Sequence, residues 1–106
     1  FIMNADGSNK QQVTNNGASN FSPFFHPDGH RVIFASNVGT RNASGRPEFH
    51  LYLVNEDGSG QERLTFDGQF NSFPMFSPDG KTLVWVSDRH AKEPGEFNVF
   101  LADWVP

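Results

Sequence analysis

The chain has 106 residues, a length that fits one small domain or a piece of a larger one. Twelve acidic against eight basic residues give a net charge of −4, which argues against a nucleic-acid partner because such partners require clustered positive charge. Without cysteine the chain can form neither a disulfide framework nor a zinc–thiolate site, and no apolar run approaches the roughly 20 residues that span a bilayer.

The chain begins with the end of one predicted unit and continues into a complete one. Phe1–Asn4 has the composition of the tail of a strand, and Lys10–Thr14 is predicted to be the strand that follows it. The first strand of the complete unit is predicted at Phe21–His26. It ends at Pro27-Asp28-Gly29, because proline lacks a backbone donor and Asp-Gly favours a tight hairpin turn.

The rest of this unit is predicted to contain three more strands. Arg31–Ser36 is apolar almost throughout, which is typical of a strand that is covered on both faces. Asn37–Glu48 is rich in Gly, Asn, Ser and Pro and is predicted to be a loop. A third strand is expected at Phe49–Val54. A more polar fourth strand, the composition of an exposed sheet edge, is expected at Gln61–Thr65.

A last unit, residues 73–104, is predicted to contain three strands and to lack the fourth. It opens with a strand–turn–strand segment, Phe73–Ser87, and its final strand follows the loop Asp88–Glu96. No segment offers ten residues at helical spacing without Gly or Pro, so no helix is expected.

The last unit repeats the one before it. Residues 1–55 laid over residues 52–106 without a gap match at 15 positions, many of them in turns, as at Asp28 and Asp79. The repeats are therefore assigned to residues 1–51 and 52–102, with a full blade at 21–65 and the last blade at 73–104. Strongly apolar strand pairs followed by more polar strands predict an all-β fold of four-stranded antiparallel β-propeller blades, about two blades of a larger propeller.

The doubled motif N-x-D-G-S…N-x-x-P-x-F-x-P-D-G…S resembles the blade repeat of the TolB-like family of bacterial β-propellers. The resemblance implies a six-bladed ring of which this chain is the C-terminal two-blade part, with a last blade completed by a strand from the N-terminal side. It also implies protein–protein interaction in the periplasm, or in an otherwise exported protein. Because two blades alone would leave apolar faces in water, we expect the remaining blades of a longer chain, or other copies of this one, to complete the ring.

No catalytic, metal or cofactor site is predicted. The four histidines lack metal-ligand spacing, and the sequence contains neither a G-x-S-x-G nucleophile elbow nor a glycine-rich phosphate loop before a helix. In a blade, the connections that follow the second and fourth strands share one face, and here they are the long and varied ones. Binding residues concentrate on such loops. The candidate binding residues are Asn20, Phe21, Arg41, Arg46, Phe70, Asn71, Arg89 and His90.

Three functions fit this sequence. The favoured one is a non-catalytic, protein-binding propeller of the TolB-like type. The second is the propeller domain of a prolyl-oligopeptidase-like hydrolase, and the third is a carbohydrate-active propeller enzyme, for which only His26 is available on a first strand. A fold alone does not decide among them.

Overall fold

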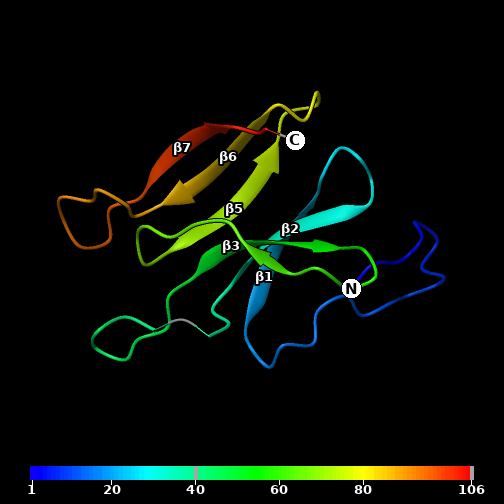
Figure 1. Ribbon diagram of the computed structural model, residues 1–106, viewed down its shortest axis with the longest axis horizontal. Coiled ribbons are helices and arrows are strands. Elements are labelled where there is room, and N and C mark those ends of the chain that lie inside the picture. The colour runs from blue at the N-terminus through cyan, green and yellow to red at the C-terminus, as the bar shows by residue number, and fades with distance from the viewer. Residues whose placement is uncertain (40, 106) are drawn as a thin grey trace.

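All regular secondary structure is β-strand, as the sequence predicts, in a computed structural model that describes residues 1–39 and 41–105. Two antiparallel sheets lie side by side (Figure 1). Blade 1 contains, in spatial order, β1 (Asn20–Phe25), β2 (Arg31–Ser36), β3 (His50–Asn55) and β4 (Glu62–Arg63). Blade 2 contains β5 (Asn71–Phe76), β6 (Thr82–Ser87) and β7 (Asn98–Asp103). The all-β propeller-blade fold is confirmed.

The first turn of each blade follows from its Asp-Gly pair. In blade 1 the backbone N–H of Gly29 donates to His26 O (2.9 Å), and Asp28 Oδ1 accepts the N–H of His30 (2.8 Å). Gly29 has φ 75°, a conformation that glycine adopts without a steric penalty. The same bonds recur around Asp79 in blade 2. Both hairpins therefore return at the same point of the repeat.

A bulge interrupts the first strand of each blade. The pairing of β1 with β2 shifts between Phe21 and Phe24, and that of β5 with β6 shifts between Ser72 and Met75. Ser22 (φ 56°) and Phe73 (φ 54°) adopt the left-handed conformation at these bulges. Ser22 Oγ lies 3.1 Å from Ser72 Oγ, so the bulged segments also connect the two blades.

The repeat offset changes within the blade, which corrects the gapless alignment. The first two strands of the blades are 51 residues apart, whereas β7 begins only 48 residues after β3. The cause is the connection between the second and third strands, which covers residues 37–49 in blade 1 and 88–97 in blade 2, three residues fewer. His50 therefore corresponds to Asn98, because the two occupy the same pairing position opposite Ser36 and Ser87.

The N-terminal segment is less regular than expected. Lys10–Thr14 was predicted to be a strand, but it forms only one isolated bridge, between Ile2 and Gln11. This bridge occupies the repeat position of the pair Leu53 and Glu62, the second of two pairs that join β3 to β4. The fourth strand is thus short in both places, and a single bridge lacks the neighbouring pairs that extend a ladder.

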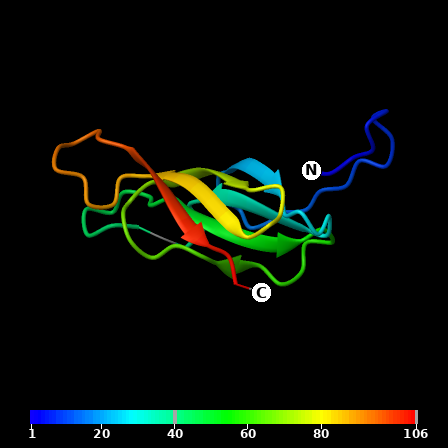
Figure 2. The same cartoon turned by 90° about the horizontal axis from the view of Figure 1, so that it is seen from above.

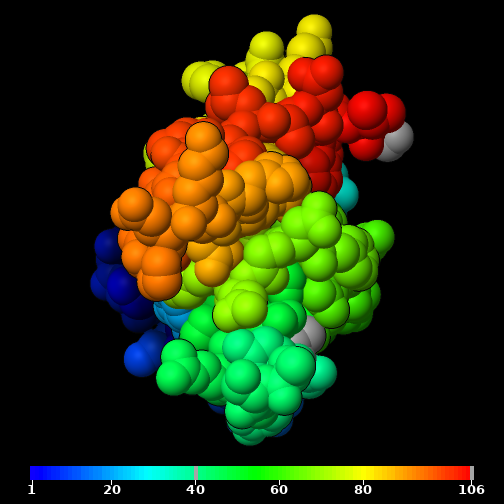
Figure 3. All heavy atoms as spheres, turned by 90° about the vertical axis from the view of Figure 1, so that its left-hand side faces the viewer, coloured from blue at the N-terminus to red at the C-terminus, as the bar shows by residue number. Residues whose placement is uncertain are grey.

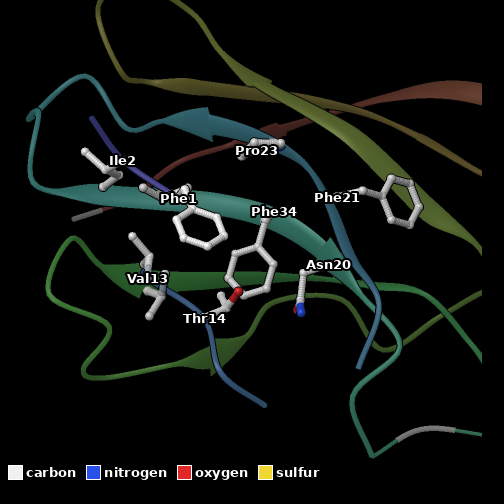
Figure 4. A pocket seen from close by; sticks show the side chains of 10 residues that line it. Phe1, Ile2, Val13, Thr14, Asn20, Phe21, Pro23 and Phe34 are labelled. Atoms are coloured by element: carbon white, nitrogen blue, oxygen red, sulfur yellow. The ribbon is translucent and has the colours of Figure 1, made fainter. Parts of the chain in front are cut away.

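The main core lies between the two blades. It combines one face of β2 and β3 with the facing side of β5 and β6, and consists of Ile33, Ala35, Leu51, Leu53, Phe76, Leu83 and Trp85. A second cluster on the other face of blade 1 consists of Val32, Phe34, Tyr52 and Val54, partly covered by Ile2 and Val13. Figure 4 shows the hollow that remains beside this cluster, into which Phe1 and Phe34 point.

The outer face of blade 2 is uncovered. Phe73, Met75, Val99 and Leu101 are all at least half exposed on β5 and β7. These are large apolar side chains on one side of a sheet, which soluble proteins normally bury. The face is therefore the place where a further blade would pack.

Candidate functional site on the loop face

The long connections gather on one side of the molecule. Residues 15–19, the described part of 37–49, residues 66–70 and residues 88–97 occupy the left and lower side of Figure 1, and the short turns occupy the right and upper side. We call the four segments the loop face. Figure 3 looks toward this side, with residues 88–97 in orange above the described residues of 37–49 in green and cyan. In Figure 2 the 88–97 loop and the N-terminal segment lie at opposite ends.

Asp88 anchors two loops of blade 2 to each other. Its Oδ1 accepts the backbone N–H groups of Gln69 (2.8 Å) and Phe70 (3.1 Å). The contact requires glycine at position 68, because a Cβ there would lie 2.7 Å from Asp88 Oδ1. In blade 1, Asn37 Oδ1 takes the corresponding role by accepting the N–H of Ser19 (2.9 Å). The loop face is therefore fixed at its base by hydrogen bonds.

An aromatic cluster supports the loops from below. The rings of Phe21 and Phe49 are 5.2 Å apart, those of Phe49 and Phe70 are 5.8 Å apart, and those of Phe70 and Phe97 are 5.4 Å apart. Edge-to-face pairs of this kind stabilise a fold by about 0.5–1.5 kcal/mol beyond their burial. Of the predicted binding residues, Phe21 and Phe70 thus contribute mainly to the scaffold.

The two predicted asparagines lie at equivalent positions but differ in surroundings. Asn20 Nδ2 donates to Asn16 Oδ1 and Ala18 O (both 3.0 Å) and is partly exposed. Asn71 is fully buried and hydrogen-bonded through both its amide atoms. Asn71 therefore cannot contact a partner in this arrangement.

Arg89 lies between the loop face and the core. Its guanidinium is 5.3 Å from the ring of Trp85 and 5.6 Å from that of Phe100. Its only ion pair within the described residues joins Nη1 to Asp67 Oδ2 at 3.9 Å, and Nε is buried without a hydrogen-bond partner there. The stacking holds this cation at the base of a hollow that is lined by residues 67–69 and 88–96.

The other predicted cations lie farther out on the loops. Arg41 Nη1 donates to Gly45 O (2.9 Å), which closes a small hairpin whose turn also includes Arg46. Arg46 and His90 are exposed, and His90 has φ 59°. Arg41, Arg46 and His90 are thus presented to solvent on a common side of the molecule, although no contact among the described residues joins them into one cluster.

On the side opposite the loop face, charged residues form hydrogen bonds within the turns. Arg31 Nε donates to Asp28 Oδ2 (2.8 Å). Together with the N–H of His30, which has the largest effect, this contact lowers the pKa of the Asp28 carboxyl to about 2. His26 is buried against the ring of Phe76 at 4.7 Å, and its Nδ1 accepts the N–H of Asp28. No group of three potential metal ligands occurs among residues 1–39 and 41–105.

Sequence reasoning missed His50, which is completely buried between the blades. In the sequence it is one of four scattered histidines, and no motif surrounds it. His50 stands at the start of the apolar strand β3, and Asn71 of the next blade lies beside it. Only these two facts taken together could have indicated a buried polar site.

The comparisons with known proteins agree with this architecture. Residues 1–104 match the family model described as the TolB beta propeller domain. The chain belongs to this family. Among curated TolB-family relatives, the Tol-Pal system protein TolB of Helicobacter hepaticus is 33% identical over 88 residues, which cover 81% of this chain and 20% of that protein. Dipeptidyl-peptidase 5 of Porphyromonas gingivalis is 32% identical over 93 residues, covering 82% of this chain and 13% of that protein.

Solved structures show the same fold. A protein of Agrobacterium tumefaciens, provisionally assigned as TolB, superposes with a TM-score of 0.75 at 28% identity, covering 95% of this chain and 35% of that one. TolB of Acinetobacter baumannii gives 0.67 at 27% identity, with coverages of 88% and 21%. The chain thus spans only about a tenth to a third of the proteins that it matches. Within the described part of the chain, no helix is long and apolar enough to cross a membrane.

Proposed function

We propose that this TolB-family segment is part of a non-catalytic β-propeller that binds a protein partner through its loop face, in the bacterial periplasm. The observation that carries the proposal is the contrast between the two sides of the blades. The turns are short and repeat the same hydrogen bonds, whereas the loops differ in length and composition and are held by Asp88 and the phenylalanine cluster. Variable loops on a rigid base are the usual location of recognition sites.

Exposed cations of the loop face are the proposed contacts. Arg41, Arg46 and His90 are all exposed, and they belong to two loops of the loop face, residues 37–49 and 88–97. Arginine is favoured in protein interfaces because its planar guanidinium forms several directed hydrogen bonds. The relationship to TolB of Helicobacter hepaticus supports a role in the cell envelope.

A second candidate is the propeller domain of a peptidase. The similarity to dipeptidyl-peptidase 5 favours it, although the matched region is only 13% of that enzyme. The carbohydrate-active alternative lacks such support, because its required strand histidine, His26, is buried against Phe76 and hydrogen-bonded to the first turn. Assaying the full-length protein with dipeptidyl substrates separates the first two candidates, since only the peptidase would release product.

Site-specific photocrosslinking tests which side binds. A photoreactive amino acid is placed in the full-length protein at His90 or Arg46 on the loop face, and at Lys81 or His30 on the turn side as matched exposed controls. We expect one defined protein adduct in cells from the loop-face positions and none from the controls. Adducts from Lys81 or His30 alone, or from no position, would contradict the proposal.

A further inference from the structure

His50 lies beneath the loop face, at the point where blade 1 meets blade 2, and its side chain is 0% exposed. Its two ring nitrogens have different partners. Nδ1 is 3.0 Å from Thr65 Oγ1, and Nε2 is 3.2 Å from Glu48 Oε1. A buried imidazole with a partner on each side has its protonation state set by those partners.

The partners assign the proton to Nε2. Glu48 is a carboxylate and accepts, so Nε2 carries the hydrogen. Thr65 Oγ1 already accepts the backbone N–H of Leu51 (3.0 Å), and its own hydroxyl hydrogen is available to donate to His50 Nδ1. The ring is therefore neutral, with Nδ1 acting as an acceptor.

Asn71 of blade 2 meets this same nitrogen. Its Nδ2 lies 3.3 Å from His50 Nδ1 and donates to Phe49 O (3.2 Å) and Asp67 O (3.0 Å). Its Oδ1 accepts from Trp85 Nε1 (3.2 Å). These bonds fix the orientation of the amide, so that an NH₂ group faces Nδ1. A proton on Nδ1 would place two donors against each other.

The charges around the ring come from three segments. Glu48 and Asp88 favour the protonated form, and Arg63 disfavours it. Burial has the largest effect, and the pKa of His50 lies below its ordinary value of 6.5. The unfolded chain therefore takes up the proton more readily than the folded one. The free energy of unfolding accordingly decreases as the pH falls below 6.5, and levels off once the pH is below the folded-state pKa.

We propose that His50 is an acid-sensitive lock between the blades: protonation of Nδ1 displaces the Asn71 amide, which loosens its bond to Trp85 and its hold on residues 67–70. The loop that Asn71 holds through Asp67 O belongs to the loop face. Acid would thus alter the surface to which the proposed function assigns partner binding. The lock does not depend on what that surface binds, so the lock and the proposed function can each be disproved without the other.

Blade 2 provides a matched reference. Asn98 occupies the position that corresponds to His50, and it is exposed and has no titrating group. The variant His50→Asn therefore introduces the residue that the repeat itself places there. His50→Gln retains a longer side chain and serves as a second variant.

The test follows two NMR signals of the full-length protein that contains this segment, between pH 8 and 5. These are the Cε1–H of His50 and the indole Nε1–H of Trp85, assigned with His50→Gln and Trp85→Phe. We expect the Trp85 signal to shift with the same midpoint as His50, below pH 6.5, and to lose this shift in both His50 variants. The proposal is overturned by a His50 signal that does not titrate in this range, by a Trp85 signal that stays constant while His50 titrates, or by a Trp85 signal that responds equally in the variants.

A further variant keeps the test decisive if both His50 variants fail to fold. Glu48→Gln retains the histidine but removes a carboxylate that favours its protonation. Both midpoints should then move together to lower pH. A Trp85 midpoint that does not move with that of His50 would mean that protonation leaves the junction intact, which also overturns the lock.

Discussion

The same sheet face occurs in both blades, but only in blade 1 is it buried. Leu51 is 0% exposed, whereas Val99 at the corresponding position of blade 2 is 68% exposed. Leu53 and Leu101 are the same residue at the same position, and they are 6% and 71% exposed. The difference arises because β5 and β6 cover the first face, and no described residue covers the second.

This comparison shows that in a repeat protein each part of the core forms between one blade and its neighbour. The apolar pattern of a blade shows that its faces are to be covered, but the next blade supplies the cover. A blade without its neighbour therefore keeps an exposed apolar face that favours association.

The largest expected effect concerns association. We expect the isolated 106-residue polypeptide to form species of at least twice its 11.9 kDa mass, because the open face buries apolar area by pairing with another copy. Light scattering coupled to size exclusion measures this mass. Leu101→Lys should shift the population toward the monomer, whereas Lys92→Glu on an exposed loop should not. A cooperatively unfolding 11.9 kDa monomer would contradict the expectation.

The next effect compares two identical truncations. Leu53→Ala should reduce the free energy of unfolding by about 2–5 kcal/mol, since it leaves a cavity between the blades. Leu101→Ala should change it by less than about 0.5 kcal/mol in the same polypeptide at a protein concentration low enough to keep it monomeric, because the side chain then meets solvent as a surface residue does. Denaturant titrations at one fixed protein concentration compare the two, because association also adds to apparent stability. In the full-length protein, the Leu101→Ala loss should rise toward that of Leu53→Ala. Equal losses in the 106-residue chain would mean that the face is already covered.

The smallest effect compares the two turns. The pKa of Asp28 is lowered to about 2, so its stabilising contribution is present above 3.8 and is lost as the pH falls toward 2. Asp28→Asn should therefore remove part of the acid dependence of unfolding in this range, with a loss below about 1 kcal/mol at neutral pH, the scale of a partly solvated ion pair. Asp79→Asn is the control, because position 82 of its turn holds Thr where blade 1 has Arg31. A larger effect at Asp79 would contradict this assignment.

The sequence predicts well the features that local chemistry determines. The Pro-Asp-Gly turns place the first two strands of each blade within two residues, and Arg31–Ser36 coincides with β2. It predicts less well what depends on distant partners. The burial of Asn71 requires Phe49, Asp67 and Trp85 to converge on it, and the third-strand register requires knowing that the preceding loop is shorter.

That shorter loop has a consequence for how such a chain can change. The connection between the second and third strands differs by three residues between the blades, yet all six pairs that join these strands retain their register. Length can therefore vary there without disturbing the sheet. Foreign peptides grafted between residues 41 and 47 should be displayed on the loop face, so insertion at this position would allow the chain to acquire new binding specificity.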